Sequence, residues 1–251
     1  MASLQEIVAF LDAELRISEI PDYSGAVNGL QLESGGTVTK VAAAVDASLP
    51  VVEAAVAAGA DLLVVHHGMF WQGTQPLTRA FYRKIKAAME GGMAIYSAHL
   101  PLDVHPGMGN NALMLKALGF EPSGTFFDWK GIRIGLVAEV ELSRDSLISK
   151  VSEAVSGPVH VCPGGPERVR KIGLVTGGAG AEVAICPNSG IDTFITGEGP
   201  HWSYPLAEEL GVNVLYAGHY ATETFGVKAL ADRLAGDFGL EQVFIDRPTG
   251  L

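Results

Sequence analysis

Hydrophobic and polar positions alternate along the chain in a repeating order that predicts an α/β protein. A short apolar run ends in polar or histidine-bearing residues, a helical stretch and a glycine follow, and another apolar run begins. The first such unit runs from a strand at 41–45, through a helix ending near Gly59, to a strand at 62–65. Strands that alternate with helices are typical of βαβ units, which form largely parallel sheets.

Helix boundaries in the first half carry recognisable end signals. Ser3, with Glu6 three residues later, forms a capping-box pattern in front of apolar residues that recur with a period of 3.6. Further helices are predicted over about 77–90 and 111–118, and each is followed by glycine, the usual residue just past a helix end.

The second half repeats the pattern with different residues. It predicts helices near 145–155, 202–210 and 222–234, and strands near 132–140, 159–162, 172–176, 193–196, 212–216 and 243–245. The turn-rich segment 121–130 separates the halves. We therefore expect two α/β domains, 1–125 and 126–251, and the final strand is a candidate to return to the first domain.

Composition narrows the class of protein. Among 251 residues, 48% are hydrophobic and 18% charged, which argues against global disorder. The 17 basic and 28 acidic residues give a net charge of −11, which argues against nucleic acid and anionic membranes as partners. Cys162 and Cys186 form no C-x-x-C pair, so neither a disulfide framework nor a thiolate zinc site is indicated. With no signal peptide pattern and no apolar run of about 18 residues, we expect a soluble cytoplasmic protein.

The histidines are placed where ligands bind in α/β proteins. Five of the seven lie at or near predicted strand ends or helix starts: His66, His67, His99, His201 and His219. In a parallel sheet, residues that follow successive strands emerge at the same carboxyl edge, which is the usual ligand edge. Asp46, the 66–67 pair and the segment 99–103 are expected there.

Five side chains offer a combination of ligands suited to metal ions: His66, His67, Asp103, His219 and Glu223. Imidazole nitrogens and carboxylate oxygens suit zinc, manganese, iron or cobalt. Five ligands exceed what one tetrahedral ion requires, so we expect two ions about 3.5–4 Å apart, bridged by a carboxylate and a hydroxide.

Each part of this set has an alternative explanation. His219 and Glu223 lie one helical turn apart and could grip one ion, but such a pair is also common on a helix surface. Neighbouring residues on a strand point to opposite faces, so His66 and His67 can share a centre only if the chain turns at Gly68. Otherwise one of them would be buried and the other exposed.

Three further residues are candidates for proton transfer. Glu198 and His201 follow the strand at 193–196 and are expected to act as a general acid/base pair or to support the metal ligands. His201 could equally mark only a helix start. His99 is expected to support Asp103 or to shuttle protons. Asp46 is expected to start a helix, and contact with a ligand is the alternative role for it. The glycine-rich turn 176–180 lacks a phosphate-loop pattern and predicts a plain tight turn.

Four stretches together resemble the YbgI-like, NGG1-interacting-factor-like family of dinuclear metal proteins, whose members are often named GTP cyclohydrolase I type 2. They are NGLQLES at 28–34, VVHHGMFW at 64–71, SAHLPLDVHPGMGNNALM at 97–114 and DTFITGEGPHWSYPLAEELGVNVLYAGHYATETFGVKAL at 192–230. The resemblance runs in order from about residue 3 to the end. Members commonly have proline at the position of Gly68, a departure that we expect to loosen the turn.

This resemblance implies a specific architecture and site. The metal ligands map onto His66, His67, Asp103, His219 and Glu223. The family implies two interlocked α/β domains with mixed, largely parallel sheets, metals in the cleft between them, and assembly into a ring-shaped homohexamer.

The leading functional hypothesis is a metal-dependent hydrolase acting on a small molecule such as a nucleotide. Two divalent ions would generate a bridging hydroxide that attacks carbon or phosphorus, while His201, Glu198 and His99 carry protons. The family name suggests GTP as substrate. The alternatives are a non-catalytic metal carrier, chaperone or regulatory scaffold, and a metallo-oxygenase. The same ligands serve all three, and the identity of the metal stays open.

Overall fold

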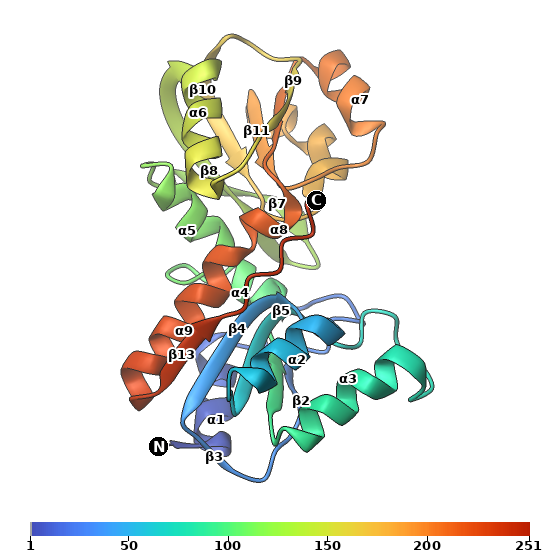
Figure 1. Ribbon diagram of the computed structural model, residues 1–251. Coiled ribbons are helices and arrows are strands. Elements are labelled where there is room, and N and C mark those ends of the chain that lie inside the picture. Colours follow the sequence, from blue (N-terminus) through green and yellow to red (C-terminus); the bar gives the residue numbers. More distant parts are fainter. Residues whose placement is uncertain (1) are drawn as a thin grey trace. The chain divides into compact units, whose positions relative to one another are not determined.

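The computed structural model describes residues 2–251, which form two compact units (Figure 1). Unit 1 comprises the chain up to Leu102 together with Gly226–Arg247, and unit 2 comprises Asp103–Phe225 together with Pro248–Leu251. Each unit contains one large mixed sheet covered by helices, so the prediction of an α/β protein is confirmed. The expected boundary at 125/126 falls inside unit 2, and Asp103 is the first residue of that unit.

The sheet of unit 1 has the strand order β13-β4-β5-β6-β2. Its strands are β2 (Gly29–Leu32), β4 (Lys40–Asp46), β5 (Leu62–His67), β6 (Ala94–Ser97) and β13 (Glu241–Phe244). Four run parallel, and β2 pairs antiparallel with β6. A separate antiparallel pair joins β1 (Ala2–Ser3) to β3 (Thr37–Val38). Because β13 pairs with β4, the last strand of the chain lies in the sheet of unit 1.

Helices cover both faces of this sheet. They are α1 (Leu4–Glu14), α2 (Leu49–Ala57), α3 (Arg79–Glu90) and α9 (Thr224–Phe238), and the short α4 (Leu100–Asp103) follows β6. Side chains of α2 and α3 pack on one face of the strands, where Leu63 and Ile95 are fully buried. On the other face Tyr96 donates a hydrogen bond from its hydroxyl to Asp12 of α1, over 2.8 Å. The predicted capping box of α1, between Ser3 and Glu6, is confirmed.

The sheet of unit 2 has the strand order β7-β8-β10-β11-β12-β9. Its strands are β7 (Gly124–Trp129), β8 (Ile132–Ser143), β9 (His160–Pro163), β10 (Arg168–Leu174), β11 (Thr193–Thr196) and β12 (Asn213–Tyr216). Among the pairings of the described strands in this sheet, β10–β11 and β11–β12 are parallel, and the other three are antiparallel. The prediction of a largely parallel sheet therefore holds for unit 1 but is wrong for unit 2.

The helices of unit 2 are α5 (Asn110–Ala117), α6 (Arg144–Val155), α7 (Ser203–Leu210) and α8 (His219–Thr222), with 3₁₀ turns η1 (Ala179–Ile185) and η2 (Pro187–Ser189). Side chains of α5 and α6 share one core with the sheet, including Met114, Leu147 and Ile172. Helix α7 contacts η1 and the strands β9 and β12. All of these helices and turns belong to unit 2.

The segment 121–130, expected to separate the two domains, contains β7, which pairs antiparallel with β8. Trp129 and Ile132 are paired, and the two residues between them, Lys130 and Gly131, both have positive φ. Two consecutive positive φ values define the tight turn that suits a two-residue hairpin. Lys130 and Gly131 therefore form the loop of a hairpin and do not mark a break between domains.

No helix among residues 2–251 is both long and apolar enough to span a membrane.

Candidate metal centre

Unit 1 brings three histidines together at the carboxyl ends of two neighbouring strands. His66 and His67 end β5, and His99 follows β6. The nitrogen ligand atoms of the three rings all lie within 4.8 Å of one another. His66 is fully buried, whereas His67 and His99 are half-buried. The strand-end position predicted from the sequence is therefore confirmed, and His99 joins the pair as a third imidazole.

Each of these rings has its Nδ1 held by an oxygen acceptor. The Nδ1–H of His66 donates to the backbone carbonyl of Ala98 over 3.0 Å. Because a carbonyl can only accept, this bond fixes the proton on Nδ1 and leaves Nε2 as the nitrogen that can bind a metal. In metal proteins, such an acceptor behind the ring orients it and raises its basicity.

Asp46 plays this part for His67, whose Nδ1 lies 2.9 Å from the Asp46 Oδ1 atom. The sequence predicted Asp46 to start a helix, and this is wrong: Asp46 ends β4 beside His67 of β5, and the N-terminal cap position of α2 is Ser48. The parallel register of the two strands, which pairs Asp46 with His67, is what brings them together.

Asp22 plays the same part for His99, with 2.9 Å between Asp22 Oδ1 and His99 Nδ1. The same carboxylate accepts hydrogen bonds from the Asn28 side chain and the Leu100 backbone N–H. Burial acts to raise the pKa of Asp22, but the interactions with His99 and the other donors outweigh it and hold the pKa below its usual value. Asp22 is thus an anion that orients His99, a role that no local sequence pattern indicated.

Unit 2 holds a second group, built on α8. His219 starts this helix and Glu223 follows its last residue, with 3.2 Å between His219 Nε2 and Glu223 Oε2. On the other side of the ring, His219 Nδ1 lies 2.8 Å from Glu198 Oε1. Burial acts to lower the pKa of His219, but Glu223 and Glu198 outweigh it and raise the pKa to about 9. Two carboxylates around one imidazole make this a site that favours a cation.

Asp103 is held in place within unit 2 by polar neighbours. It is 6% exposed, and its Oδ1 accepts a hydrogen bond from the Asn110 side chain over 2.8 Å and lies 3.4 Å from the Thr176 hydroxyl oxygen. Thr176 is fixed in turn, because its backbone N–H and its hydroxyl both donate to Asn111. This network orients the carboxylate of Asp103.

The glycine-rich turn at 176–180 passes directly beside the His219 group. Gly177 has φ +70, and a Cβ atom there would overlap the carboxylate of Glu223. Its carbonyl accepts hydrogen bonds from the backbone of Gly197 and Glu198. The turn is therefore a close-packed support for these acidic residues, which agrees with the predicted tight turn and gives it a purpose that the sequence did not reveal.

The donor chemistry of the two groups fits divalent metal ions of intermediate softness. The available atoms are imidazole nitrogens and carboxylate oxygens, which suit zinc, manganese, iron and cobalt. Both cysteines are buried elsewhere, and burial raises the pKa of the Cys186 thiol to about 12, so it stays protonated. Four histidines present Nε2 with Nδ1 held from behind: His66, His67, His99 and His219.

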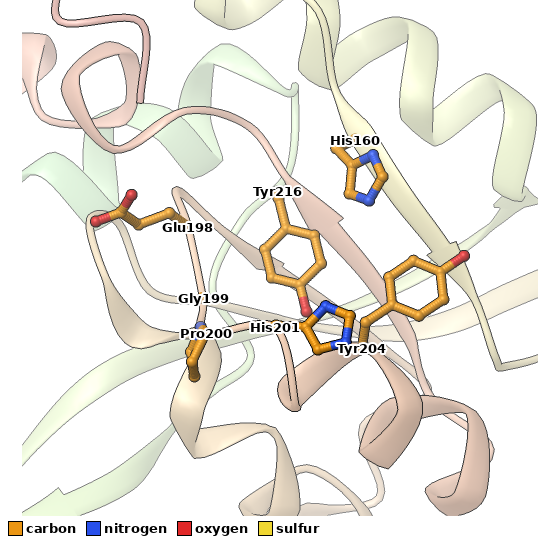
Figure 2. A pocket seen from close by; sticks show the side chains of 7 residues that line it. All are labelled: His160, Glu198, Gly199, Pro200, His201, Tyr204 and Tyr216. Carbon is orange, nitrogen blue, oxygen red and sulfur yellow. The ribbon is translucent and has the colours of Figure 1, made fainter.

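Glu198 and His201, the other proposed catalytic residues, both line one pocket of about 450 Å³ in unit 2 (Figure 2). Glu198 lies between this pocket and His219, to which it bonds. His201 is exposed, and among the described residues of unit 2 no hydrogen bond joins it to His219. The remaining lining side chains include His160, Tyr204 and Tyr216, which the sequence did not single out because they lie far apart in the chain.

Comparison with known proteins now places the chain in a family. The family model for DUF34/NIF3, described as NGG1p interacting factor 3, matches residues 2–249. The chain belongs to the DUF34/NIF3 family. A relative from Archaeoglobus fulgidus, named GTP cyclohydrolase 1 type 2 homolog, is 42% identical over 249 residues, which cover 99% of this chain and 100% of the relative. The family resemblance seen in the sequence is therefore confirmed.

Solved structures of DUF34/NIF3 relatives share the fold over almost the whole chain. The crystal structure of TTHA1606 from Thermus thermophilus is 39% identical with a TM-score of 0.89, and covers 98% of this chain and 99% of that one. A solved structure of the protein ybgI, described as of unknown function, is 33% identical with a TM-score of 0.91 and the same coverage.

Proposed function

We propose that this DUF34/NIF3 protein is a metal-dependent hydrolase that binds two divalent ions. The proposed ligands are His66, His67, Asp103, His219 and Glu223. The observation that carries the proposal is the common anchoring of the histidines, each with Nδ1 against an oxygen acceptor and Nε2 as the remaining ligand atom. Structural histidines that only fill a core do not require this arrangement.

A nucleotide is the proposed class of substrate. Relatives at 38–42% identity carry the name GTP cyclohydrolase 1 type 2 homolog, so GTP is the first compound to test. The chain has a net charge of −11, which would repel an anionic substrate. Bound cations would offset this charge locally, and they would supply a nucleophile by lowering the pKa of water toward neutrality.

Side chains of both units are proposed to position the metal ligands and to transfer protons. Glu198 holds the His219 ring through Nδ1, and its position in the pocket wall suits it to accept a proton from the nucleophile. His201, exposed in the same wall, is placed to protonate a leaving group. In unit 1, Asp22 fixes His99 so that this ring can support a ligand or relay a proton.

Metal content tests the centre of the proposal. The full chain, purified without chelator or metal-binding tag and reconstituted with zinc, manganese or iron, should hold about two ions per chain by elemental analysis. Glu223→Ala should lose most of this metal, and Glu208→Ala, an exposed glutamate on α7, should lose none. Equal metal content in wild type and Glu223→Ala would refute the ligand set.

Turnover separates an enzyme from a metal carrier. His201→Ala should abolish hydrolysis of GTP or of another nucleotide while its metal content stays at the wild-type level. Glu198→Ala is less suitable for this comparison, because Glu198 also orients His219 and its loss should weaken metal binding. A protein that binds two ions and hydrolyses no nucleotide or phosphoester would favour the metal carrier.

A further inference from the structure

The pocket of unit 2 that includes Glu198 is lined on most sides by aromatic rings. Figure 2 shows the rings of His160, His201, Tyr204 and Tyr216 gathered together, with the carboxylate of Glu198 directed away from them. The pocket volume of about 450 Å³ lies in the range of small-molecule sites. Its walls come from β9, β12, the loop 198–201 and the start of α7, so all of its lining belongs to one compact unit.

The rings are held in a fixed arrangement. His160 and Tyr216 are direct partners across the antiparallel pair of β9 and β12, with ring centroids 5.9 Å apart and planes inclined by 32°. Tyr204 lies 5.7 Å from His160, at an inclination of 41°. The three rings therefore lie near one another and stay accessible, because His160 is exposed and both tyrosines are half-buried.

A hydrogen-bond chain fixes the central ring. Ser203 donates its hydroxyl proton to the Pro200 carbonyl over 2.7 Å, so its oxygen accepts the proton of the Tyr216 hydroxyl, also over 2.7 Å. Gly199 passes beside this ring, and a Cβ atom there would come within 2.9 Å of Tyr216 Cε1. The absence of a side chain at Gly199 therefore keeps the edge of Tyr216 open.

The chemistry of the lining selects a flat and uncharged group. Aromatic faces attract planar rings by stacking, and imidazole nitrogens at His160 and His201 offer hydrogen bonds at the edge of such a ring. None of the seven lining residues is lysine or arginine, so the pocket offers a phosphate group no permanently charged partner. The pocket thus fits the base of a nucleotide and not its phosphates.

We infer that this pocket binds the purine base of the substrate, stacked against His160, Tyr204 and Tyr216. The inference rests on the proposed function for the claim that the occupant is the substrate. The binding of the ring itself depends only on the pocket. Since Glu198 joins the pocket to His219, a base held here directs the rest of the nucleotide toward Glu198.

Calorimetric titration of the full chain with guanosine tests this inference, because a nucleoside has no phosphate to bind a metal. Guanosine should bind in both the metal-free and the metal-loaded protein, and free ribose should not bind. His160→Leu should weaken guanosine binding by roughly ten- to hundredfold, the usual cost of losing one stacking partner. His160→Phe keeps an aromatic face and should stay within about threefold of wild type.

A matched control and a second variant keep the test decisive. Tyr82→Leu removes an exposed aromatic ring from α3 of unit 1 and should leave guanosine binding unchanged. Tyr204→Leu should weaken binding as His160→Leu does. Absence of guanosine binding to wild type, or equal binding in wild type, His160→Leu and Tyr204→Leu, would overturn the inference.

The outcomes also distinguish this inference from the proposed function. Metal binding and nucleotide hydrolysis that survive in His160→Leu with unchanged KM would leave the hydrolase intact and refute the base site. Guanosine binding that requires the aromatic rings in a protein without hydrolytic activity would support the base site and refute the hydrolase.

Discussion

The histidine group of unit 1 and the His219 group of unit 2 are built on the same anchoring principle but differ in charge. In unit 1 three imidazoles lie together, and their oxygen acceptors stand behind the rings at Nδ1. In unit 2 one imidazole lies between two carboxylates, one at each ring nitrogen. Unit 1 therefore offers imidazole nitrogens, whereas unit 2 combines one imidazole with carboxylate oxygens.

Because of this difference, the two groups depend on different interactions to keep their arrangement. In unit 1 the orientation of each imidazole depends on the oxygen acceptor at its Nδ1. In unit 2 the charge of the carboxylates must be offset by a cation or a proton. The pKa of His219 is raised to about 9 because a proton on this ring offsets part of the charge of the carboxylates. A metal ion bound to His219 would have to replace this proton, so a metal and a proton would compete for unit 2.

The largest expected effect tests the close packing of unit 2. Gly177→Ala should lower the free energy of unfolding by about 2–5 kcal/mol, since it combines an unfavourable positive φ with overlap of its Cβ and the Glu223 carboxylate. It should also remove most of the bound metal. Urea unfolding and elemental analysis of the same preparation measure both effects.

The neighbouring glycine provides the matched control for Gly177. Gly178 has φ −90, and a Cβ atom there would meet the His219 ring at 3.5 Å, an ordinary contact. Gly178→Ala should therefore change stability by less than about 1 kcal/mol and keep its metal. Similar losses in the two variants would mean that the turn tolerates no side chain at all, and that the Glu223 contact is not the cause.

Local patterns in the sequence predicted the individual elements well. The strand at 193–196 is observed as Thr193–Thr196, and the helix at 145–155 is observed as Arg144–Val155. The capping box at Ser3 is also local, and it is present. At 121–130 the turn-rich residues suggested a domain boundary, whereas Phe126 and the Lys130-Gly131 turn belong to a hairpin.

The anchors of the histidines could not be predicted in the same way. Asp46 and His67 are 21 residues apart, and their contact follows from the register of two parallel strands. Asp22 and His99 are 77 residues apart, and Asp22 lies in a loop without a periodic pattern. Ligand types can be read from residue chemistry, but the acceptors behind them depend on tertiary pairing.

An intermediate effect tests the anchors of unit 1. Asp46→Ala should reduce metal affinity by about 10- to 100-fold, because His67 loses the acceptor that fixes its ring. Asp46→Asn keeps an oxygen acceptor and should lose less than tenfold. Titration with a competing chelator measures these affinities.

Asp61 is the matched control for Asp46 in the same unit. Its carboxylate accepts hydrogen bonds from the backbone N–H groups of Thr39 and Lys40, at the opposite end of β4. Asp61→Ala should reduce stability without changing metal affinity. An equal loss of affinity in Asp46→Ala and Asp61→Ala would show that unit 1 responds to general destabilisation and not to the anchor.

The smallest expected effect concerns the turn after His67. The glycine at position 68 was expected to loosen this turn, but the side chain of Gln31 fills the space beside it. Gln31 accepts a hydrogen bond from the Met69 N–H over 2.7 Å, and it donates to the carbonyls of Ala26 and Val27. A Cβ atom on Gly68 would overlap this amide, so the two residues form one packed unit.

Gln31→Ala should therefore lower the free energy of unfolding by about 1–2 kcal/mol and metal affinity by less than tenfold, because it removes hydrogen bonds but no ligand or anchor. Gly68→Ala should have a similar effect by displacing the same amide. If the two act through one contact, the double variant should be little worse than either single variant, since residues that share an interaction are not additive. Losses of stability that add fully in the double variant would mean that Gln31 does not brace the turn, and that the geometry of His67 depends on its Asp46 anchor alone.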